Sequence, residues 1–395
     1  MIARTRNFFA LERNVLASVL MTALIMSGLG MWSQFMPKYL EALGAPVIAV
    51  GALATMAIAF LSVSFVLGGH LSDMYGRKRM FLFGTLLGVA DTLIFVLSPS
   101  WVFAIPGMII TSFVVGTILT SESALVTESL PKNKRATGRA SIQVSSLLTV
   151  AVVAPIGGVI VDQMGMLDGV RQAMYFDMAM TLVAAAVGFF MIKETLVRRP
   201  GKKPWPGISS TVRFVRGLPA EVKNLVISRA FSLFAWGLVA TYFVYYALDI
   251  VRITALEWGI VGSIASTVMM MSTFVGAKIS DRYGRKHTIL VTFAAAAAVP
   301  LLYVLSAGPF QLLFVGAVAG LMGMGLSSVD AYTADYTPRR IRARAIGVTN
   351  SLFAVAMVPG PIIGGIIFSV SPHALFVSSF AIGMLSLFVG WKLLK

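Results

Sequence analysis

Twelve long runs of apolar residues follow one another along the 395-residue chain and constrain its fold more than any other feature. A hydrocarbon core about 30 Å thick needs about 20 apolar residues to cross it as a helix. The runs are continuously apolar and do not alternate in a period of two, which indicates helices and not the strands of a barrel. The predicted spans are residues 14–36, 47–68, 80–98, 101–125, 141–162, 173–192, 223–249, 256–277, 287–306, 309–333, 345–368 and 373–394. The sequence therefore predicts an all-α membrane protein with twelve transmembrane helices.

Lysine and arginine residues lie almost entirely on one side of these predicted spans and give the chain a formal net charge of +16. Of the 32, all but Lys38, Arg171, Arg229 and Arg252 lie at the two ends or in the even-numbered connections. Because Lys and Arg are retained in the cytoplasm during insertion, we expect a multi-pass protein of the cell membrane with both termini cytoplasmic. The cations also attract anionic lipid headgroups. No nucleic-acid recognition module accompanies them, so we expect the lipid bilayer as a partner and no nucleic acid.

A charged motif occurs twice, as GGHLSDMYGRKRM at Gly68–Met80 and as GAKISDRYGRKHT at Gly276–Thr288. The shared residues lie 208 positions apart, and in the first copy they are Gly68, Ser72, Asp73, Tyr75, Gly76, Arg77 and Lys78. Further along, matching residues lie 207 positions apart, among them Glu128, Pro131 and Arg135 with Asp335, Pro338 and Arg342. Similarity at a fixed distance over this length indicates an internal duplication.

The duplication predicts two six-helix halves, residues 1–192 and 223–395, joined by a cytoplasmic linker of residues 193–222. An even number of spans returns the chain to the same side of the membrane, so the two halves are expected to have the same orientation. The linker has the charge and the Pro and Gly content of a connecting segment. Part of it, residues 207–217, is a candidate for a basic helix on the membrane surface.

These motifs resemble those of the major facilitator superfamily. Gly69-x-Leu71-x-Asp73-x-x-Gly76-Arg77-Lys78-Arg79 resembles the family's signature between spans 2 and 3. The copy Asp281-Arg282-x-Gly284-Arg285-Lys286 resembles it too, although Ala277 stands where the first glycine belongs. Glu128-x-x-Pro131-x-x-x-Arg135 and Asp335-x-x-Pro338-x-x-x-Arg342 resemble the matching pattern between spans 4 and 5. The resemblance covers essentially the whole chain and implies two halves that rock about a binding site near the middle of the membrane.

The resemblance also implies that the motifs form a gate, which holds the outward-open state and releases when the cavity opens inward. The gate residues are Gly69, Asp73, Gly76, Arg77, Lys78, Glu128, Arg135, Asp281, Gly284, Arg285, Lys286, Asp335 and Arg342. From the residues alone, each aspartate at a helix end can pair with an arginine, and Gly76 and Gly284 permit a tight turn with positive φ. The alternative is that these loops only fix the topology.

Two departures weaken the resemblance to the drug:proton antiporters of this family. Those proteins typically carry an arginine in span 4, and residues 101–125 contain none. They also carry a Gly-Pro-x-x-Gly-Gly run in span 5, where this chain has Ala154-Pro155-Ile156-Gly157-Gly158. The full run, Gly360-Pro361-Ile362-Ile363-Gly364-Gly365, occurs in span 11 instead. Small residues let helices approach closely, so packing is the simpler reading of both runs.

Ionisable residues inside the spans are costly to bury and are therefore functional candidates. The candidates for proton coupling are Asp91, Glu122 and Asp330. Asp91 is about 16 Å into its span at 1.5 Å per residue, and apolar surroundings favour the protonated form that a coupling site needs. Pairing with a neighbouring helix is the alternative for Asp91. Four other acids, Asp162, Asp177, Asp249 and Glu257, are expected near the outer surface with solvated side chains.

Polar and aromatic residues of several spans are candidates to line the substrate cavity. They are Trp32, Gln34, Gln143, Arg229, Trp236, Tyr242 and Asn350. Gln143 and Asn350 are equivalent in the two copies, which favours a shared place between the halves. Arg229 is positioned to hold an anionic group or a carboxylate partner. An aromatic belt at the membrane interface is the alternative for the tyrosine.

No phosphate-binding loop, nucleophile elbow or metal-ligand spacing occurs in the sequence, so we expect neither an enzyme nor a bound metal or cofactor. Transport then has to be driven by a gradient. We expect a monomeric secondary active transporter that moves a small molecule by alternating access, with proton-coupled export of amphipathic compounds as the preferred function. The alternatives are a facilitator or symporter for a sugar, organic acid or other metabolite and, from another class, a membrane sensor that does not transport.

Overall fold

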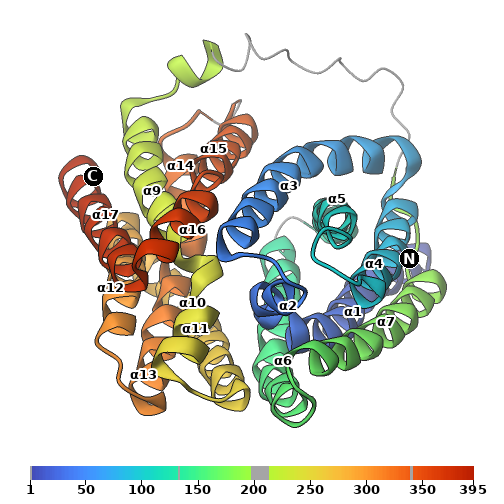
Figure 1. The fold of residues 1–395 in the computed structure, drawn as a ribbon. Helices are drawn as coiled ribbons and strands as arrows, with labels where there is room; N and C mark the ends of the chain where they lie inside the picture. Colours follow the sequence, from blue (N-terminus) through green and yellow to red (C-terminus); the bar gives the residue numbers. More distant parts are fainter. Residues whose placement is uncertain (1, 132–133, 197–212, 339–340) are drawn as a thin grey trace. The chain divides into compact units, whose positions relative to one another are not determined.

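The computed structural model describes residues 2–131, 134–196, 213–338 and 341–395 and is built of helices (Figure 1). Among the described residues, twelve helices are long and apolar enough to cross a membrane. Each of them overlaps one of the twelve predicted spans, so the predicted fold class is confirmed. Candidate residues 207–212 of the predicted surface helix lie outside the described residues.

The first six spans are formed by seven α-helices. Their bounds are α1 Ile2–Trp32, α2 Met36–Ala42, α3 Val47–Tyr75, α4 Arg77–Leu97, α5 Ile105–Ser129, α6 Arg135–Met164 and α7 Met166–Met191. A short 3₁₀ turn, Ser33–Phe35, joins α1 to α2 within one span. Helix α3 continues to Tyr75, seven residues past the predicted end, because the apolar window marks membrane depth and not helix length.

The last six spans are interrupted more often. Their α-helices are α9 Ala220–Val239, α10 Phe243–Tyr245, α11 Ala255–Tyr283, α12 Arg285–Val304, α13 Pro309–Gly320, α14 Leu326–Asp335, α15 Arg342–Met357, α16 Gly360–Val370 and α17 Pro372–Leu393. A 3₁₀ segment, Leu321–Gly325, separates α13 from α14 where glycines weaken the helix. Between α15 and α16, Pro359 and Pro361 lack the N–H that a continuous helix requires.

The chain forms two compact units. Unit 1 comprises Met1–Pro46, Met56–Val197 and Thr254–Ser263, and unit 2 comprises Val47–Thr55, Arg198–Ile253 and Ile264–Lys395. These units resemble the predicted halves except that each takes in a short piece of the other half's sequence. The division at residues 192 and 222 stays a prediction.

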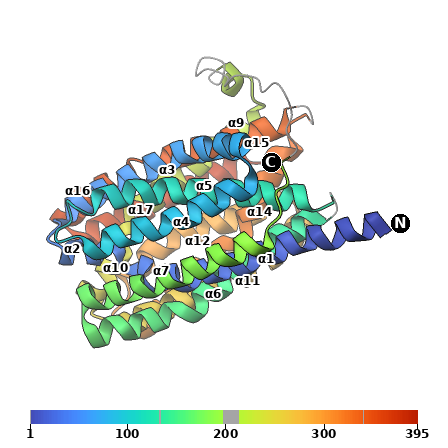
Figure 2. The same ribbon diagram turned by 90° about the vertical axis from the view of Figure 1, so that its right-hand side faces the viewer.

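In both units the last long helix packs against the first. Helix α7 lies against α1 in unit 1, and α17 lies against α9 in unit 2 (Figures 1 and 2). Asn14 in α1 donates through Nδ2 to the carbonyl of Lys193 at 3.0 Å, just after α7. Asn224 in α9 donates in the same way to the carbonyl of Leu393 at 3.2 Å. The internal duplication is therefore visible in the contacts as well as in the sequence.

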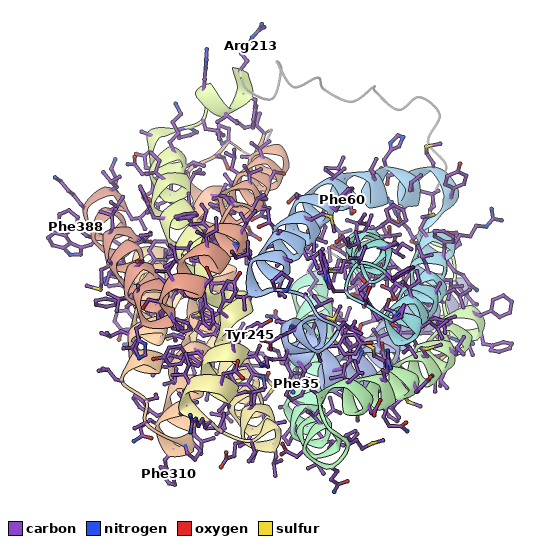
Figure 3. The ribbon with its side chains drawn as sticks, in the orientation of Figure 1. Phe35, Phe60, Arg213, Tyr245, Phe310 and Phe388 are labelled. Atoms are coloured by element: carbon purple, nitrogen blue, oxygen red, sulfur yellow. The ribbon has the colours of Figure 1, made fainter. Side chains whose placement is uncertain are left out.

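The core and the surface of the helical units are both apolar, as expected for a protein whose outer face meets lipid. Phe35 and Tyr245 are fully buried, whereas Phe310 and Phe388 point away from the ribbon and are largely exposed (Figure 3). The core of unit 1 between α1, α4, α5 and α7 consists of Ala17, Met21, Phe81, Leu125, Ala184 and Ile192. Lipid tails are as apolar as leucine, so close packing holds these helices together.

Gly28 permits the closest approach of α1 to α7. A Cβ atom added at Gly28 would overlap both the backbone Cα and the carboxylate Oδ1 of Asp177. Small residues at such crossings let two transmembrane backbones come together.

We expect Gly28→Ala to destabilise the protein by about 1–3 kcal/mol, because the added methyl group forces α1 and α7 apart. The matched control is Gly347→Ala in α15, where an added Cβ meets nothing within 4 Å; the higher helix propensity of alanine should make it neutral or stabilising by up to about 1 kcal/mol. Thermal unfolding of the purified proteins in detergent measures both. Equal midpoints for the two variants would contradict the close approach.

Candidate functional site

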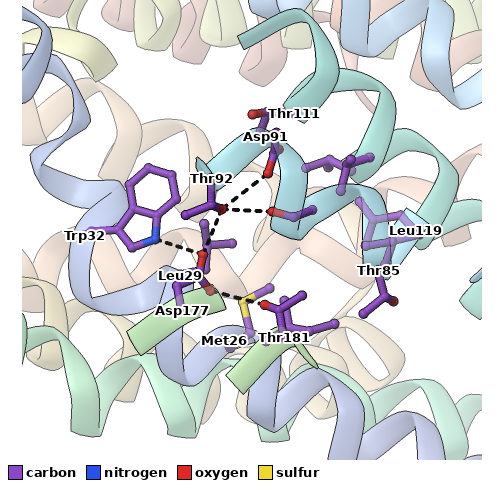
Figure 4. A pocket seen from close by; sticks show the side chains of 15 residues that line it. Met26, Leu29, Trp32, Thr85, Asp91, Thr92, Thr111, Leu119, Asp177 and Thr181 are labelled. Carbon is purple, nitrogen blue, oxygen red and sulfur yellow. Dashed lines mark hydrogen bonds between the residues drawn. The ribbon is translucent and has the colours of Figure 1, made fainter. Parts of the chain in front are cut away.

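Two buried carboxyl groups, Asp91 of α4 and Asp177 of α7, lie on one small cavity inside unit 1 (Figure 4). Each residue is only 5% exposed. The Thr92 hydroxyl stands between them, 3.3 Å from Asp91 Oδ1 and 3.2 Å from Asp177 Oδ2. The same hydroxyl donates to the backbone carbonyl of Gly88 at 2.9 Å. The two carboxyl groups thus share one polar neighbour at the depth of the membrane helices.

The two carboxyl groups have different sets of hydrogen-bond donors. Asp177 Oδ2 accepts from the indole Nε1 of Trp32 at 3.1 Å, and its Oδ1 accepts from the Thr181 hydroxyl at 3.4 Å. Beside Asp91, the Thr111 side chain lies on the other side from Thr92 (Figure 4). Both carboxyl groups thus lie among hydroxyl groups, whereas the indole N–H of Trp32 donates to Asp177 alone.

The expectation that Asp177 is a solvated residue near the outer surface is wrong. Helix α7 begins at Met166, seven residues before the predicted start, because the polar residues Asp168 and Arg171 occupy its first turns. Asp177 consequently lies eleven residues into the helix, about 16 Å from its start. Its burial against Trp32 and Thr92 makes it a partner of Asp91, which the sequence-based prediction missed.

The cavity beside this pair has a volume of about 110 Å³ and is mostly apolar. It lies among α1, α4, α5 and α7, and its apolar lining is Ile25, Met26, Leu29, Val114, Val115, Ile118 and Leu119. Among the described residues that line it there is no lysine, arginine or histidine. Two carboxyl groups in apolar surroundings without a cation favour binding a proton, because charge burial is costly and the two charges repel.

The two other candidates for proton coupling differ in their surroundings. Glu122 of α5 is 7% exposed and accepts a hydrogen bond from the Thr22 hydroxyl of α1 at 2.6 Å. Asp330 of α14 is exposed and accepts a hydrogen bond from the Asn350 side-chain amide at 3.4 Å. Glu122 thus resembles the Asp91–Asp177 pair in burial, whereas Asp330 does not.

Arg229 of α9 is the basic candidate inside a span of unit 2. Its guanidinium lies over the ring of Phe353, 4.7 Å from the centroid. Its buried Nε has no hydrogen-bond partner in the described part of the chain. Asp330 is the nearby acid whose charge acts on Arg229, yet no ion pair joins the two among the described residues. Arg229 was expected to hold either a carboxylate partner or an anionic group. Among the described residues no carboxylate forms an ion pair with it, so the first expectation is not met there.

The remaining cavity candidates fall into two groups. Tyr242 is fully buried, donates its hydroxyl to the carbonyl of Pro361 at 2.7 Å and stacks on Phe368, so its contacts are structural. Trp32 is likewise buried against Asp177. The less buried candidates are Gln34, which donates to the carbonyl of Ala154 at 3.1 Å, Trp236, which packs on Phe243, and the exposed Gln143 and Asn350. Their role in a substrate cavity stays a prediction.

In the first copy of the gate motif, one arginine joins two helix ends. Arg77, the first residue of α4, forms an ion pair with Asp73 of α3. It also pairs with Glu128 of α5, with 3.0 Å between Nη2 and Oε1. A third bond runs from Arg77 Nη1 to the Ser72 hydroxyl at 3.3 Å.

The second copy repeats this arrangement with equivalent residues. Arg285 pairs with Asp281, and its Nε lies 3.3 Å from Asp335 Oδ2. Its Nη1 donates to the Ser280 hydroxyl at 3.1 Å. The expected pairing of aspartate with arginine is confirmed in both copies, and in each copy these bonds lie within one unit.

Glycines make the turns of both copies, as predicted. Gly76 has φ 111° and Gly284 has φ 93°, values that favour glycine. The copies differ at the next helix start, where Glu194 accepts the backbone N–H groups of Arg77 at 2.8 Å and Lys78 at 3.2 Å. Sequence reasoning missed Glu194, because it follows the last apolar residue of span 6 with no pattern to mark it.

The other members of the gate motif are less constrained by their contacts. A Cβ added at Gly69 meets nothing within 4 Å. Arg135 donates through Nε to the Leu130 carbonyl at 3.2 Å, whereas the buried Nε of Arg342 has no hydrogen-bond partner among the described residues. Lys286 follows Arg285 in the first turn of α12.

A family model described as the Major Facilitator Superfamily matches residues 18–222 and 225–395. The chain belongs to this superfamily. It is therefore a transporter and not an enzyme, and transporters of the family typically need no cofactor. As a member of the superfamily with twelve apolar helices in its described part, it is a multi-pass membrane protein, and transporters of this family bind small molecules within the membrane.

Relatives in the major facilitator superfamily include proteins of drug resistance. The chain is 30% identical to the "Tetracycline resistance protein, class C" of Escherichia coli over 148 residues, which are 36% of each protein. A similar protein of Pasteurella multocida, class H, matches over 31% of each protein, so the chain spans about a third of these two relatives. The "Multidrug resistance protein MdtG" of Escherichia coli is 22% identical over 90% of this chain and 88% of its own length.

Solved structures of the superfamily share the fold. A mutant form of the nucleoside transporter NupG superposes with a TM-score of 0.79, covering 96% of this chain and 100% of NupG at 14% identity. The human organic anion transporter MFSD10 has a TM-score of 0.68, covering 96% of this chain and 99% of MFSD10 at 18% identity. At these identities the likeness concerns the fold alone.

The two gate arginines should differ in their contribution to stability. The side chain of Arg77 is 12% exposed and that of Arg285 is 27% exposed. We expect Arg77→Gln to destabilise the protein by about 1–3 kcal/mol, because charged hydrogen bonds are lost from a more enclosed place. Arg285→Gln should cost about 0–1 kcal/mol, as for more exposed pairs. Thermal unfolding at low and high salt measures both, and the reverse order would contradict this assignment.

Proposed function

We propose that this transporter exports small amphipathic compounds in exchange for protons, and that Asp91 and Asp177 form its proton site. The observation that supports the proposal is the pair itself: two buried carboxyl groups on one apolar cavity, linked by Thr92 and faced by no cation among the described residues. A group that exchanges protons across a membrane has to change its charge in a place that water reaches only part of the time. Buried carboxylic acids are suited to that role.

The hydrogen bonds favour placing the proton on Asp91. The Trp32 indole, which can only donate, bonds to Asp177 and stabilises its charged form. Asp91 has the hydroxyls of Thr92 and Thr111 beside it, which are able to accept from a neutral carboxyl group. Thr92 has a single hydroxyl proton, which the Gly88 carbonyl accepts. The Thr92 oxygen is then able to accept a hydrogen bond from a neutral Asp91 carboxyl group. Such a pair titrates as a unit, with one proton and one negative charge in its middle state.

Loading and release of a second proton, on Asp177, would act on α1 through Trp32. Trp32 is the last residue of α1, directly before the 3₁₀ turn Ser33–Phe35. Its indole donates to Asp177, the charged member of the pair. A second proton on Asp177 would weaken that bond and release the end of α1. Since Trp32 is itself a candidate to line the substrate cavity, this change is our proposed route from proton to substrate.

The two copies of the gate motif are proposed to control the transition between outward-open and inward-open states. Arg77 and Arg285 each draw two carboxylates from different helices together. An arginine with two acidic partners is able to exchange one of them as the helices move. A role in topology alone is the alternative.

The substrate, direction and setting are part of the proposal. Two relatives are named for resistance to tetracycline and to multiple drugs, and we propose drug export as the activity of this chain. We place it in the cell membrane as a monomer with both termini in the cytoplasm, since the cations lie on that side of the predicted spans. A facilitator or symporter for a sugar, organic acid or other metabolite is the second candidate function.

Asp91→Asn and Asp177→Asn should each uncouple substrate flux from the pH gradient, because an amide side chain does not bind or release a proton at the pH values of the assay. The assay is flux of a panel of dyes and metabolites into proteoliposomes with and without an imposed gradient. Asp168→Asn, an exposed position in the first turn of the same helix α7, is the matched control and should respond like the unmodified protein. A gradient response that survives in both variants would exclude the pair as the proton site. If substrate flux through the unmodified protein does not depend on the gradient, the result would favour a facilitator. If no substrate is transported, the result would favour a sensor.

Asp73→Asn should lower transport severalfold at normal expression if the motif is a gate, because Arg77 loses one of its two carboxylates. Its counterpart Asp281→Asn is the matched variant in the second copy. Initial rates in the same proteoliposomes measure both. Unchanged rates would leave topology as the role of the motif.

A further inference from the structure

We propose that Arg229 binds the negatively charged group of the substrate, so that the cargo is an amphipathic organic anion. This inference deepens the proposed function, on which it rests for the existence of a transported compound. It concerns unit 2 alone and uses a different part of the molecule from the Asp91–Asp177 pair.

The first step is the position of Arg229 inside its helix. It lies nine residues after the start of α9 at Ala220, or about 13 Å along the helix axis. At that depth a charged side chain is expected to face the interior of a helix bundle or a cavity that water enters. Its Nε is buried and has no hydrogen-bond partner among the described residues.

The second step is the way the guanidinium is held. It lies over the face of Phe353, 4.7 Å from the ring centroid. Stacking of this kind holds the plane of an arginine and leaves the N–H groups at its edge available, which suits bidentate binding of a carboxylate, sulfonate or phosphate. A lysine in this place would offer a charge without that fork of donors.

The third step is the neighbouring polar residues. Asp330 acts on Arg229 through its charge but bonds to Asn350 at 3.4 Å and forms no ion pair with Arg229 in the described part of the chain. Asp330 and Asn350 are both exposed. Exposed polar side chains at these positions of transmembrane helices indicate a water-accessible space beside Arg229.

The surroundings also limit what the anion is attached to. Phe353 belongs to an apolar core with Leu225, Ile289 and Phe293, and the partly buried Val226 and Leu233 of α9 pack on it. Val226 and Leu233 lie three residues before and four residues after Arg229 on the same face of α9, so a ligand that reaches the arginine meets partly exposed apolar side chains next to the charge. An organic anion with an aromatic or aliphatic body fits both features, whereas an inorganic anion would use only one.

The test compares two fluorescent probes that differ by one charged group. These are 1-anilinonaphthalene-8-sulfonate, which is anionic, and N-phenyl-1-naphthylamine, which has the same rings without the sulfonate. Binding to the full chain in nanodiscs is measured by titration, with empty nanodiscs subtracted. The variants are Arg229→Gln, Arg229→Lys and, as a control on an exposed residue before α9, Arg213→Gln.

We expect saturable binding of the sulfonate to the unmodified protein and to Arg213→Gln. Arg229→Gln should weaken it about tenfold to a hundredfold, the effect of losing hydrogen bonds to a charged group. The sulfonate affinity of Arg229→Lys should lie between those of the unmodified protein and Arg229→Gln. The affinity for the neutral probe should be the same in all four proteins.

Three results would overturn the inference: no saturable sulfonate binding to the unmodified protein, equal sulfonate binding by Arg229→Gln, or an equal loss of both probes in that variant. Because the titration uses no pH gradient, its outcome is independent of proton coupling. Failure of the Asp91 and Asp177 variants to uncouple flux would leave the anion site standing, and failure of the anion site would leave the proton site standing.

Discussion

A polar group in the hydrocarbon core of a membrane has no water to bond with, and this constraint determines the rest of the structure. The backbone satisfies it by forming helices throughout the spans. The buried carboxyl groups satisfy it with polar side chains: Trp32 donates to Asp177, Thr22 donates to Glu122, and the Thr92 hydroxyl lies beside both members of the pair. The Nε of Arg229 has no such partner among the described residues, which is the reason for proposing a ligand there.

Close helix approach brings these groups together. With lipid on the outside, apolar side chains have little preference for the interior of the bundle, so packing depends on how near two backbones come. Gly28 brings the backbone of α1 directly against Asp177, and the indole of Trp32, one turn later, reaches the same carboxylate. The pairing at the candidate proton site is therefore a consequence of a helix crossing that only a glycine permits.

The sequence predicted the fold well and the candidate site in part, for identifiable reasons. Apolar windows of membrane length are a direct consequence of bilayer thickness, so all twelve spans could be located, and the repeated motif located Arg77 and Arg285 with their partners. Asp177 was missed because the polar residues Asp168 and Arg171 hide the start of α7, which shifted the predicted span seven residues. No periodicity could show that Asp91 faces α7, or that Glu194 returns to the start of α4, because both depend on contacts between distant segments.

The duplication has a consequence for charge. The two units descend from one ancestral sequence and still share their turns, their arginine pairs and the asparagine that fastens the last helix to the first. Inside the membrane, however, the two units differ: the described spans of unit 1 bury Asp91, Glu122 and Asp177, whereas those of unit 2 combine Arg229 with the exposed Asp330. A duplicated chain can keep one scaffold in both copies while the ionisable residues inside them change. In this protein, the turns and arginine pairs have stayed alike in the two units, whereas the charged residues inside the spans have not.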